Sequence, residues 1–231
     1  MQANIRFAAE SAMFNNDGLF RRSGVAGVLN VDISFSNNGT VEIVSGALRF
    51  TTDFDQSSGG ELIIDIGGTG TTQFGAVDFQ GQTTVDGRLK IELTNGFEPA
   101  PGQSFQILTF DSLDGWFDSI EVPDATTNVA LVPMQSNTDL SLRATLTGDA
   151  NFDDVVNFDD FIILTNNFDS TDMTWQDGDF NFDTVVNFVD FAFLANNFGA
   201  VAIPQAQPNP EPASLALFTL AILALRIKRS N

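Results

Sequence analysis

Two short stretches of the chain carry Asp and Asn at one spacing, thirty residues apart. In each stretch these side chains fall at positions 1, 3, 5, 9 and 12 of a twelve-residue segment, and a valine stands at position 7. Such a loop, with the backbone carbonyl of position 7, offers oxygens to a hard cation such as Ca²⁺, which takes about six to eight of them. The sequence therefore predicts two Ca²⁺ ions, one in each loop. The expected ligands are Asp149, Asn151, Asp153, Val155, Asn157 and Asp160 in the first loop, and Asp179, Asn181, Asp183, Val185, Asn187 and Asp190 in the second.

The residues that follow both loops have the periodicity of a helix. Apolar side chains recur at helical intervals over 158–164 and again over 188–194. Each run ends at Asn-Asn-Phe, at 166–168 and 196–198, and Gly199 after the second run is a usual helix stop. We therefore expect one helix after each loop.

The duplicated unit Gly-Asp-x-Asn-Phe-Asp-x-Val-Val-Asn-Phe-x-Asp-Phe resembles the type I dockerin, a paired loop and helix module that binds calcium. The resemblance covers residues 147–200. The unit matches a dockerin better than it matches a full EF-hand, because position 12 is Asp rather than Glu and no entering helix precedes either loop. The resemblance implies a small α-helical domain that docks a cohesin-type protein. In dockerins, loop positions 10 and 11 contribute to that contact, and here they are Phe158 and Asp159, and Phe188 and Val189.

Position 6 of each loop departs from the usual calcium-loop pattern. Glycine normally stands there because the loop turns sharply, but this chain has Asp154 in the first loop and Thr184 in the second. Asp tolerates a left-handed backbone fairly well, whereas a β-branched Thr does so poorly. We therefore expect the second site to be weaker or more strained.

The composition is strongly acidic, with a formal charge of −20 and a pI near 4.1. This charge argues against nucleic acid or an anionic membrane surface as the main partner. Eleven Asp lie between residues 148 and 190, and no Lys or Arg occurs between Arg143 and Arg226. We therefore expect folding of this segment to be coupled to metal binding. The absence of Cys, His and Tyr excludes disulfides, thiol chemistry, imidazole bases and the usual zinc sites.

Residues 1–146 have the pattern of short β-strands separated by Gly, Asn and Asp. Apolar and polar residues alternate over 40–44, 61–66, 88–93 and 140–146, which predicts strands with one buried face. A weak repeat relates 15–24 to 37–46 at an offset of 22 residues. A period of about twenty residues favours a β-solenoid, whose coils cover one another's edges. A β-sandwich is the alternative.

Three segments resemble the closing coils of autotransporter-type and adhesin-type bacterial β-solenoids: 86–93, 95–108 and 114–117. The resemblance covers residues from about 15 to 122. It implies a fold and an extracellular location, and no reaction. The region could be the tail of a longer solenoid.

Four acidic residues of this half, Glu61, Asp65, Asp86 and Glu92, could provide the pair of carboxylates that glycoside hydrolysis needs. Each lies beside a turn or on the polar face of a predicted strand, so we expect solvated charges. Trp116 could stack on a glycan, and we expect it to pack in the core.

The C-terminal end combines a proline-containing linker over 201–212, an apolar run over 213–225 and a basic cluster over 226–229. A thirteen-residue helix spans about 20 Å, less than the roughly 30 Å of the hydrocarbon core. Snorkelling of the basic end would lengthen it. We therefore expect a single transmembrane segment over 213–231.

The order of Pro-Glu-Pro, apolar helix and basic cluster resembles the PEP-CTERM sorting signal of Gram-negative bacteria. The residues that carry this resemblance are Pro210, Glu211, Pro212, Arg226, Lys228 and Arg229. It implies that the segment holds an exported protein in the inner membrane until an exosortase-type enzyme processes it. The basic end agrees with a cytoplasmic position. An export signal is expected at the other end, but residues 1–14 contain no continuous apolar region. We therefore expect Met1 not to be the true start.

Together these features predict an exported, non-catalytic protein of the bacterial cell surface or extracellular matrix. It has a β-rich body, a calcium-folded docking module and a removable membrane tether. The module could instead be only a calcium-dependent spacer. The alternative from another class is a carbohydrate-active enzyme, or a fragment of one, that its dockerin recruits to a polysaccharide-degrading complex.

Overall fold

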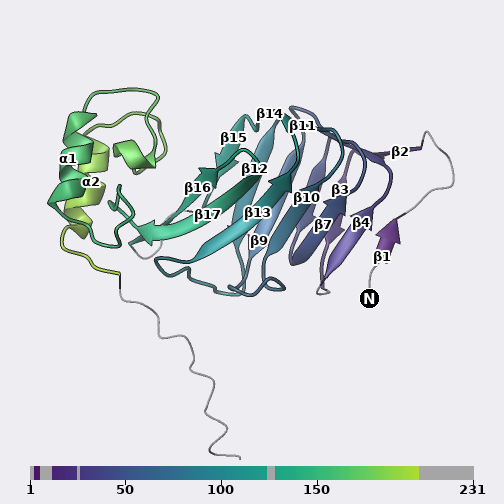
Figure 1. Cartoon of the computed structure of the whole chain (residues 1–231), viewed down its shortest axis with the longest axis horizontal. Coiled ribbons are helices and arrows are strands. Elements are labelled where there is room, and N and C mark those ends of the chain that lie inside the picture. The colour runs from purple at the N-terminus through teal and green to yellow at the C-terminus, as the bar shows by residue number, and fades with distance from the viewer. Residues whose placement is uncertain (1–2, 6–11, 25–26, 124–127, 203–231) are drawn as a thin grey trace, which may run out of the picture.

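The computed structural model of the chain describes residues 3–5, 12–24, 27–123 and 128–202. It has a mainly β N-terminal region of three parallel sheets, followed by two short helices (Figure 1). The expected transmembrane segment over 213–231 and the sorting residues Pro210 to Pro212 and Arg226 to Arg229 lie outside the described residues. In the portion that is described, no helix is both long enough and apolar enough to cross a membrane.

Successive strands of the described chain alternate among the three sheets, so that each turn of the chain adds one strand to each sheet. The largest sheet has the order β1 (Ala3–Ile5), β4 (Val28–Val31), β7 (Gly46–Phe50), β10 (Gly75–Phe79), β13 (Ser104–Phe110), β17 (Asp139–Leu146), β16 (Val129–Gln135). The second has the order β14 (Asp114–Gly115), β11 (Thr83–Val85), β8 (Phe54–Gln56), β5 (Ser34–Asn37), β2 (Met13–Asn16). The third has the order β15 (Ser119–Glu121), β12 (Arg88–Leu93), β9 (Glu61–Ile66), β6 (Thr40–Ile43), β3 (Leu19–Arg22).

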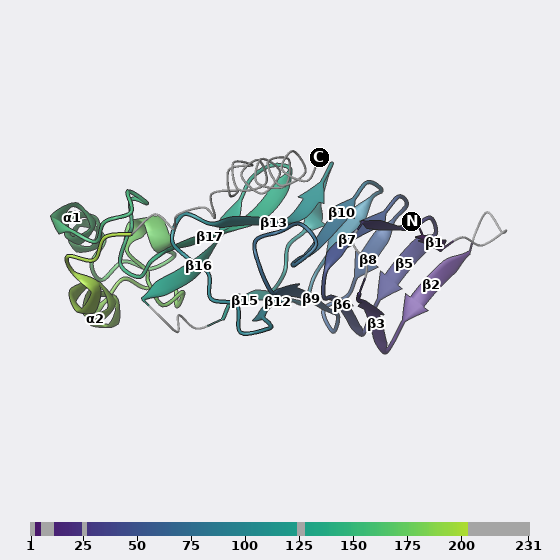
Figure 2. The ribbon, with the colours of Figure 1, turned by 90° about the horizontal axis from the view of Figure 1, so that it is seen from below.

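Neighbouring strands within the coils are parallel, which is the arrangement of a solenoid. The β-sandwich alternative is therefore wrong, because its sheets would be antiparallel. Figure 2 shows β3, β6, β9 and β12 along one side of the solenoid and β7, β10 and β13 along another. The strands predicted over 61–66 and 88–93 are confirmed as β9 and β12, and those over 40–44 and 140–146 correspond to β6 and β17.

The register between the first coils is 21 residues, because Asn16 pairs with Asn37 and Leu19 with Thr40. The offset of 22 in the sequence repeat is therefore wrong by one residue. Asn37 is buried and its neighbour Asn38 is exposed, so a shift of one residue would reverse the faces of the strand.

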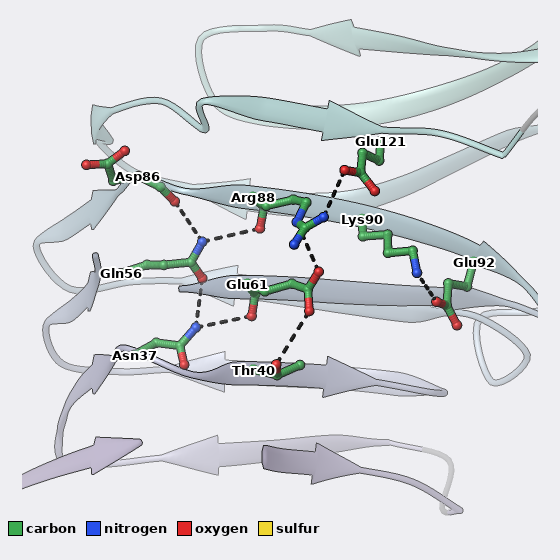
Figure 3. Close-up of polar contacts among 9 residues, drawn as sticks. All are labelled: Asn37, Thr40, Gln56, Glu61, Asp86, Arg88, Lys90, Glu92 and Glu121. Carbon is green, nitrogen blue, oxygen red and sulfur yellow. Dashed lines mark hydrogen bonds and ion pairs between the residues drawn. The ribbon is translucent and has the colours of Figure 1, made fainter. Parts of the chain in front are cut away.

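Phenylalanine rings and carboxamide groups stack from coil to coil inside the solenoid, beside a core of aliphatic side chains. The Phe14 and Phe35 ring centroids are 5.0 Å apart, and those of Phe35 and Phe54 are 5.9 Å apart. At the bend between β5 and β6, Asn37 Nδ2 donates to Gln56 Oε1 at 2.9 Å (Figure 3). Stacked rings and a buried amide ladder thus fix one coil on the next.

The solenoid ends in an antiparallel hairpin and not in another coil. β17 runs antiparallel to β13, and β16 runs antiparallel to β17. The helical module follows this hairpin, with α1 (Phe158–Asn166), the short 3₁₀ helix η1 (Trp175–Asp177) and α2 (Phe188–Asn197). It lies at the end of the solenoid opposite β1 and β2 (Figure 1). Both predicted helices are therefore present.

Candidate calcium-binding loops

The first loop is organised around the carboxylates at positions 1 and 12. Asp149 Oδ1 accepts from the backbone N–H of Asp153 at 3.1 Å, and its Oδ2 accepts from that of Asp154 at 3.1 Å. Asp160 Oδ1 accepts from the backbone N–H of Ala150 at 2.8 Å. The side chains of the first and last positions therefore draw the loop backbone around them.

Intermediate positions of the loop turn the backbone in the same way. Asn151 Oδ1 accepts from the backbone N–H of Asp153 at 2.9 Å, and Asp153 Oδ1 accepts from that of Val155 at 3.0 Å. Asn157 caps α1 by accepting from the N–H of Asp159 at 2.6 Å. These side-chain to backbone bonds are typical of Asx turns and helix caps, and they set the direction of α1.

The second loop repeats these contacts thirty residues later. Asp179 accepts from the backbone N–H groups of Asp183 and Thr184, at 3.2 and 2.9 Å. Asp190 Oδ1 accepts from the N–H of Phe180 at 2.8 Å, and Asn187 caps α2. Sequence repetition thus gives two loops of the same local conformation.

Both loops pass through the left-handed region at positions 4 and 6. At position 6 the φ angles are 68° for Asp154 and 66° for Thr184, as the sequence predicts. At position 4 they are 59° for Phe152 and 62° for Phe182, which the sequence analysis does not anticipate. Because a β-branched residue rarely adopts such a φ, Thr184 is more strained than Asp154 at the same loop position.

Each loop buries two carboxylates without a basic side chain in the surrounding sequence. Asp149, Asp160 and Asp190 are 0% exposed and Asp179 is 2% exposed. Burial raises the pKa of Asp149, Asp160 and Asp179, because charge is disfavoured away from water. No Lys or Arg lies between residues 144 and 202. A bound cation would supply the counter-charge that the sequence of the module lacks.

The donor set of each loop consists of oxygens, which suits a hard cation. Among the described residues, no group of three or more His, Cys, Asp or Glu side chains is placed to hold a metal ion. A calcium site here therefore requires the Asn amides and the backbone carbonyl of Val155 or Val185 in addition to the carboxylates. These are the ligands that the spacing predicts.

The segment after each helix pairs with the loop of the other half. The backbone N–H of Val156 donates to Ala200 O at 2.9 Å, and that of Val186 donates to Ser170 O at 3.1 Å. The two helices also touch, with the Phe161 and Phe191 ring centroids 6.2 Å apart. The two loops thus belong to one folded unit.

The side chains expected to contact a partner lie in the first turn of each helix. Phe158, Asp159, Phe188 and Val189 are all exposed, Phe158 at 60% and Phe188 at 74%. The Phe188 ring also packs edge-to-face on Phe168, with centroids 5.0 Å apart. The first turns of the helices therefore present large apolar groups to solvent.

Three of the four solenoid carboxylates singled out in the sequence have local partners. Glu61 pairs with Arg88 at 3.1 Å and Glu92 with Lys90 at 2.6 Å, as Figure 3 shows. The Asp86 side chain accepts from the backbone N–H of the next residue at 2.7 Å.

Asp65 departs from the expected solvated state, because it is only 3% exposed and its Oδ1 has no hydrogen-bond partner. Burial, followed by repulsion from Glu42 and Glu92, raises the pKa of Asp65 to about 6. Glu92 lies directly beside it on β12. Trp116 is partly buried against the solenoid core, which agrees with a packing role.

Comparisons with protein-family models, with curated proteins and with solved structures find no match to this chain. Inferences about its function therefore depend on its own residues.

Proposed function

We propose that the chain is an exported, non-catalytic bacterial protein of the cell surface or extracellular matrix, with a calcium-dependent module that docks another protein. The observation that carries the proposal is the pair of buried carboxylates in each loop, Asp149 with Asp160 and Asp179 with Asp190. The other predicted ligands in each loop also offer oxygen atoms, and no basic residue is present in the module. A divalent cation would offset both charges and connect the two ends of the loop.

The twelve predicted ligands, six in each loop, are the residues that would hold the two ions. Bound calcium would supply positive charge and would not take part in a reaction. The chain's own contribution is to hold the carboxylates within a loop that Asn157 or Asn187 joins to a helix. Calcium and the helical fold would then stabilise each other.

Docking through the first helical turns is supported by the exposed side chains there. Phe158 and Phe188 are large, apolar and exposed, and each follows directly from a loop that orients it. The partner we propose is a cohesin-type protein, in keeping with the resemblance to dockerins.

The tether and the location are proposed from the sequence. Pro210 to Pro212, the apolar run and the basic cluster of Arg226, Lys228 and Arg229 would hold the protein in the inner membrane. An exosortase-type enzyme would then process it and release it to the cell surface or beyond.

Calorimetric titration of the whole chain with Ca²⁺, followed in parallel by circular dichroism at 222 nm, tests the metal proposal. We expect two equivalents to bind and the helical signal to rise. Asp153→Asn and Asp183→Asn should each weaken one site, because both residues are exposed ligands that do not support the core. Asp169→Asn removes an exposed charge outside the ligand set and is the matched control. A chain that binds no calcium, or binds it equally in all variants, contradicts the proposal.

Biolayer interferometry against a panel of cohesin-type domains, with calcium and with a chelator, tests the docking proposal. Phe158→Ser and Phe188→Ser should lose binding while they retain calcium affinity. Leu19→Ser is a suitable control, because Leu19 is 61% exposed on the solenoid. Equal binding by all three variants would contradict a role for the helical faces.

A carbohydrate-active enzyme is the second candidate, and the state of Asp65 favours it. A carboxyl group with a pKa of about 6 beside a second carboxylate, Glu92, is a pattern found in acid and base catalysis. Release of sugars from a panel of polysaccharides, lost in Asp65→Asn and retained in Asp55→Asn, would support it. An absence of release by the wild-type chain leaves Asp65 a structural residue.

A further inference from the structure

The first loop is bonded to the last strand of the solenoid. Thr145 of β17 donates its hydroxyl to Asp149 Oδ2 at 2.8 Å, and both residues are 0% exposed. Hydrogen bonds to a carboxylate are stronger than those between neutral groups. The carboxylate at position 1 is therefore held from the solenoid as well as from its own loop.

Arg143 of β17 holds the same loop at position 4. Its Nη2 donates to the backbone carbonyl of Phe152 at 3.0 Å, and its guanidinium carbon lies 4.6 Å from the centroid of the Phe152 ring. Phe152 has a left-handed backbone. The contact with Arg143 thus stabilises one of the unusual turns on which the loop depends.

Apolar packing joins the hairpin to the module in the same region. Ala130 and Val132 of β16 and Leu146 of β17 belong to one core with Val156 and Leu164 of the module. Phe180 and Val186 of the second loop belong to the same core, so the hairpin shares buried surface with both halves of the module.

Among the described contacts, the first ligand of the second loop has no equivalent hydrogen bond to the solenoid. Thirty residues after Thr145 stands Trp175, which donates its Nε1–H to the backbone carbonyl of Asp149 at 2.7 Å. The Asp179 carboxylate accepts from N–H groups within its own loop. The two loops therefore differ in what surrounds their first ligand, although their sequences repeat.

Two cavities lie where the second loop faces the solenoid. One of about 420 Å³ is lined by residues 132–135 of β16 and by Asp179 and Thr184. The other, of about 500 Å³, lies between β15 and the second loop and is lined by Ile120, Asn181 and others. The solenoid thus hydrogen-bonds to the first loop, whereas the second loop meets it through the shared apolar core and these two cavities.

We propose that Thr145 is a positioning residue for the first calcium site, and that calcium at this site stabilises the hairpin that closes the solenoid. The inference deepens the proposed function and rests on calcium binding to the loops. Because Thr145 helps to hold Asp149 in place, the first site should lose less conformational freedom on binding calcium. It should therefore bind calcium more tightly than the second site. By reciprocity, its ion should stabilise β16 and β17.

Hydrogen exchange of the whole chain, measured by mass spectrometry with and without Ca²⁺, tests the coupling. In the wild type we expect calcium to slow exchange in residues 129–146 as well as in 148–199. Protection confined to 148–199 would overturn the inference and leave the calcium proposal intact. An absence of calcium binding by calorimetry would instead overturn the calcium proposal itself.

Substitutions at Thr145 test the residue directly. Thr145→Val keeps the shape and removes the hydroxyl, and it should weaken one of the two sites roughly tenfold. Thr145→Ser keeps the hydroxyl and should therefore have wild-type affinity. Thr147→Val is the matched control, because the Thr147 hydroxyl is buried two residues away with no hydrogen-bond partner. Equal calcium affinity of Thr145→Val and Thr147→Val would overturn the role of Thr145. Should Thr145→Val not fold, Thr145→Ala removes the same hydroxyl and is titrated beside Thr147→Ala, and equal calcium affinity of these two variants would overturn the role of Thr145.

Discussion

Asp154 and Thr184 hold the same place in the two loops and share a left-handed backbone, with φ angles of 68° and 66°. Only the second is β-branched, so the same turn is more strained in the second loop. Asparagine visits this region readily, and Thr184→Asn should raise the free energy of unfolding by about 1 kcal/mol. The affinity of the second calcium site should rise roughly fivefold in parallel.

Chemical denaturation in calcium and calorimetric titration measure these two effects. The matched control is Thr171→Asn, which makes the same exchange at an exposed threonine outside the set of residues with positive φ. A Thr184→Asn variant no more stable than Thr171→Asn would show that position 6 stores no strain.

The second prediction concerns Asp65 and the dependence of stability on pH. Its pKa in the folded protein is about 6, above its ordinary value of 3.8, so the folded state binds this proton more tightly than the unfolded state. The contribution of Asp65 to stability should therefore fall as pH rises from about 4 to above 6, by up to about 3 kcal/mol. Asp65→Asn should remove this dependence and be more stable than the wild type at pH 7.5.

The difference in unfolding free energy between Asp65→Asn and the wild type, measured from pH 4 to 8, isolates this residue from the acids of the loops. Asp55→Asn, on the strand β8 that precedes β9 along the chain, removes an exposed carboxylate and is the control. A constant difference across this range would mean that Asp65 is ionised throughout.

The third prediction concerns the buried amide ladder of Asn16, Asn37 and Gln56. Gln56 Nε2 donates to the backbone carbonyl of Asp86 at 2.8 Å, and a backbone carbonyl can only accept. This contact directs Gln56 Oε1 towards Asn37, which must donate, and Asn37 Oδ1 then accepts from Asn16 at 2.8 Å. Asn37→Asp should therefore cost about 3 kcal/mol or more at neutral pH, because an ionised carboxylate has no N–H to donate and is buried.

Part of that loss should be recovered in acid, because the introduced carboxyl group regains one donor when it is protonated. Urea denaturation at pH 7 and pH 4 measures both values. Asn38→Asp, one residue away and exposed, should lose less than about 1 kcal/mol. Similar losses at positions 37 and 38 would be incompatible with a directional ladder.

Local patterns in the sequence predict the loops, the helices and several strands, because ligand spacing and apolar periodicity can be recognised within a short segment. The solenoid also follows from the repeat, although its register does not. The buried contact between Asn16 and Asn37 sets the offset at 21, and no single strand reveals which Asn faces inward.

The sequence does not show which residues are buried by parts of the chain that are distant in sequence. Asp65 alternates with Ile64 and Ile66 as an outward residue should, yet it is covered in the folded chain. The strand β16 has little alternation, so the closing hairpin is not predicted. Thr145 similarly shows its role only when β17 and the first loop are seen together.

The last prediction concerns Gly178, where the chain approaches α1 before the second loop. Its φ is 104°, and an added Cβ would lie 2.9 Å from the Cα of Leu164. Gly199 has a similar φ of 86°, but nothing lies within 4 Å of the place its Cβ would take. Gly199→Ala therefore measures the cost of the backbone conformation alone, about 1–2 kcal/mol. Gly178→Ala should cost about 1–3 kcal/mol more, because α1 must also move away. Guanidinium unfolding in calcium, followed at 222 nm, separates the two, and equal losses would mean that α1 can retreat without penalty.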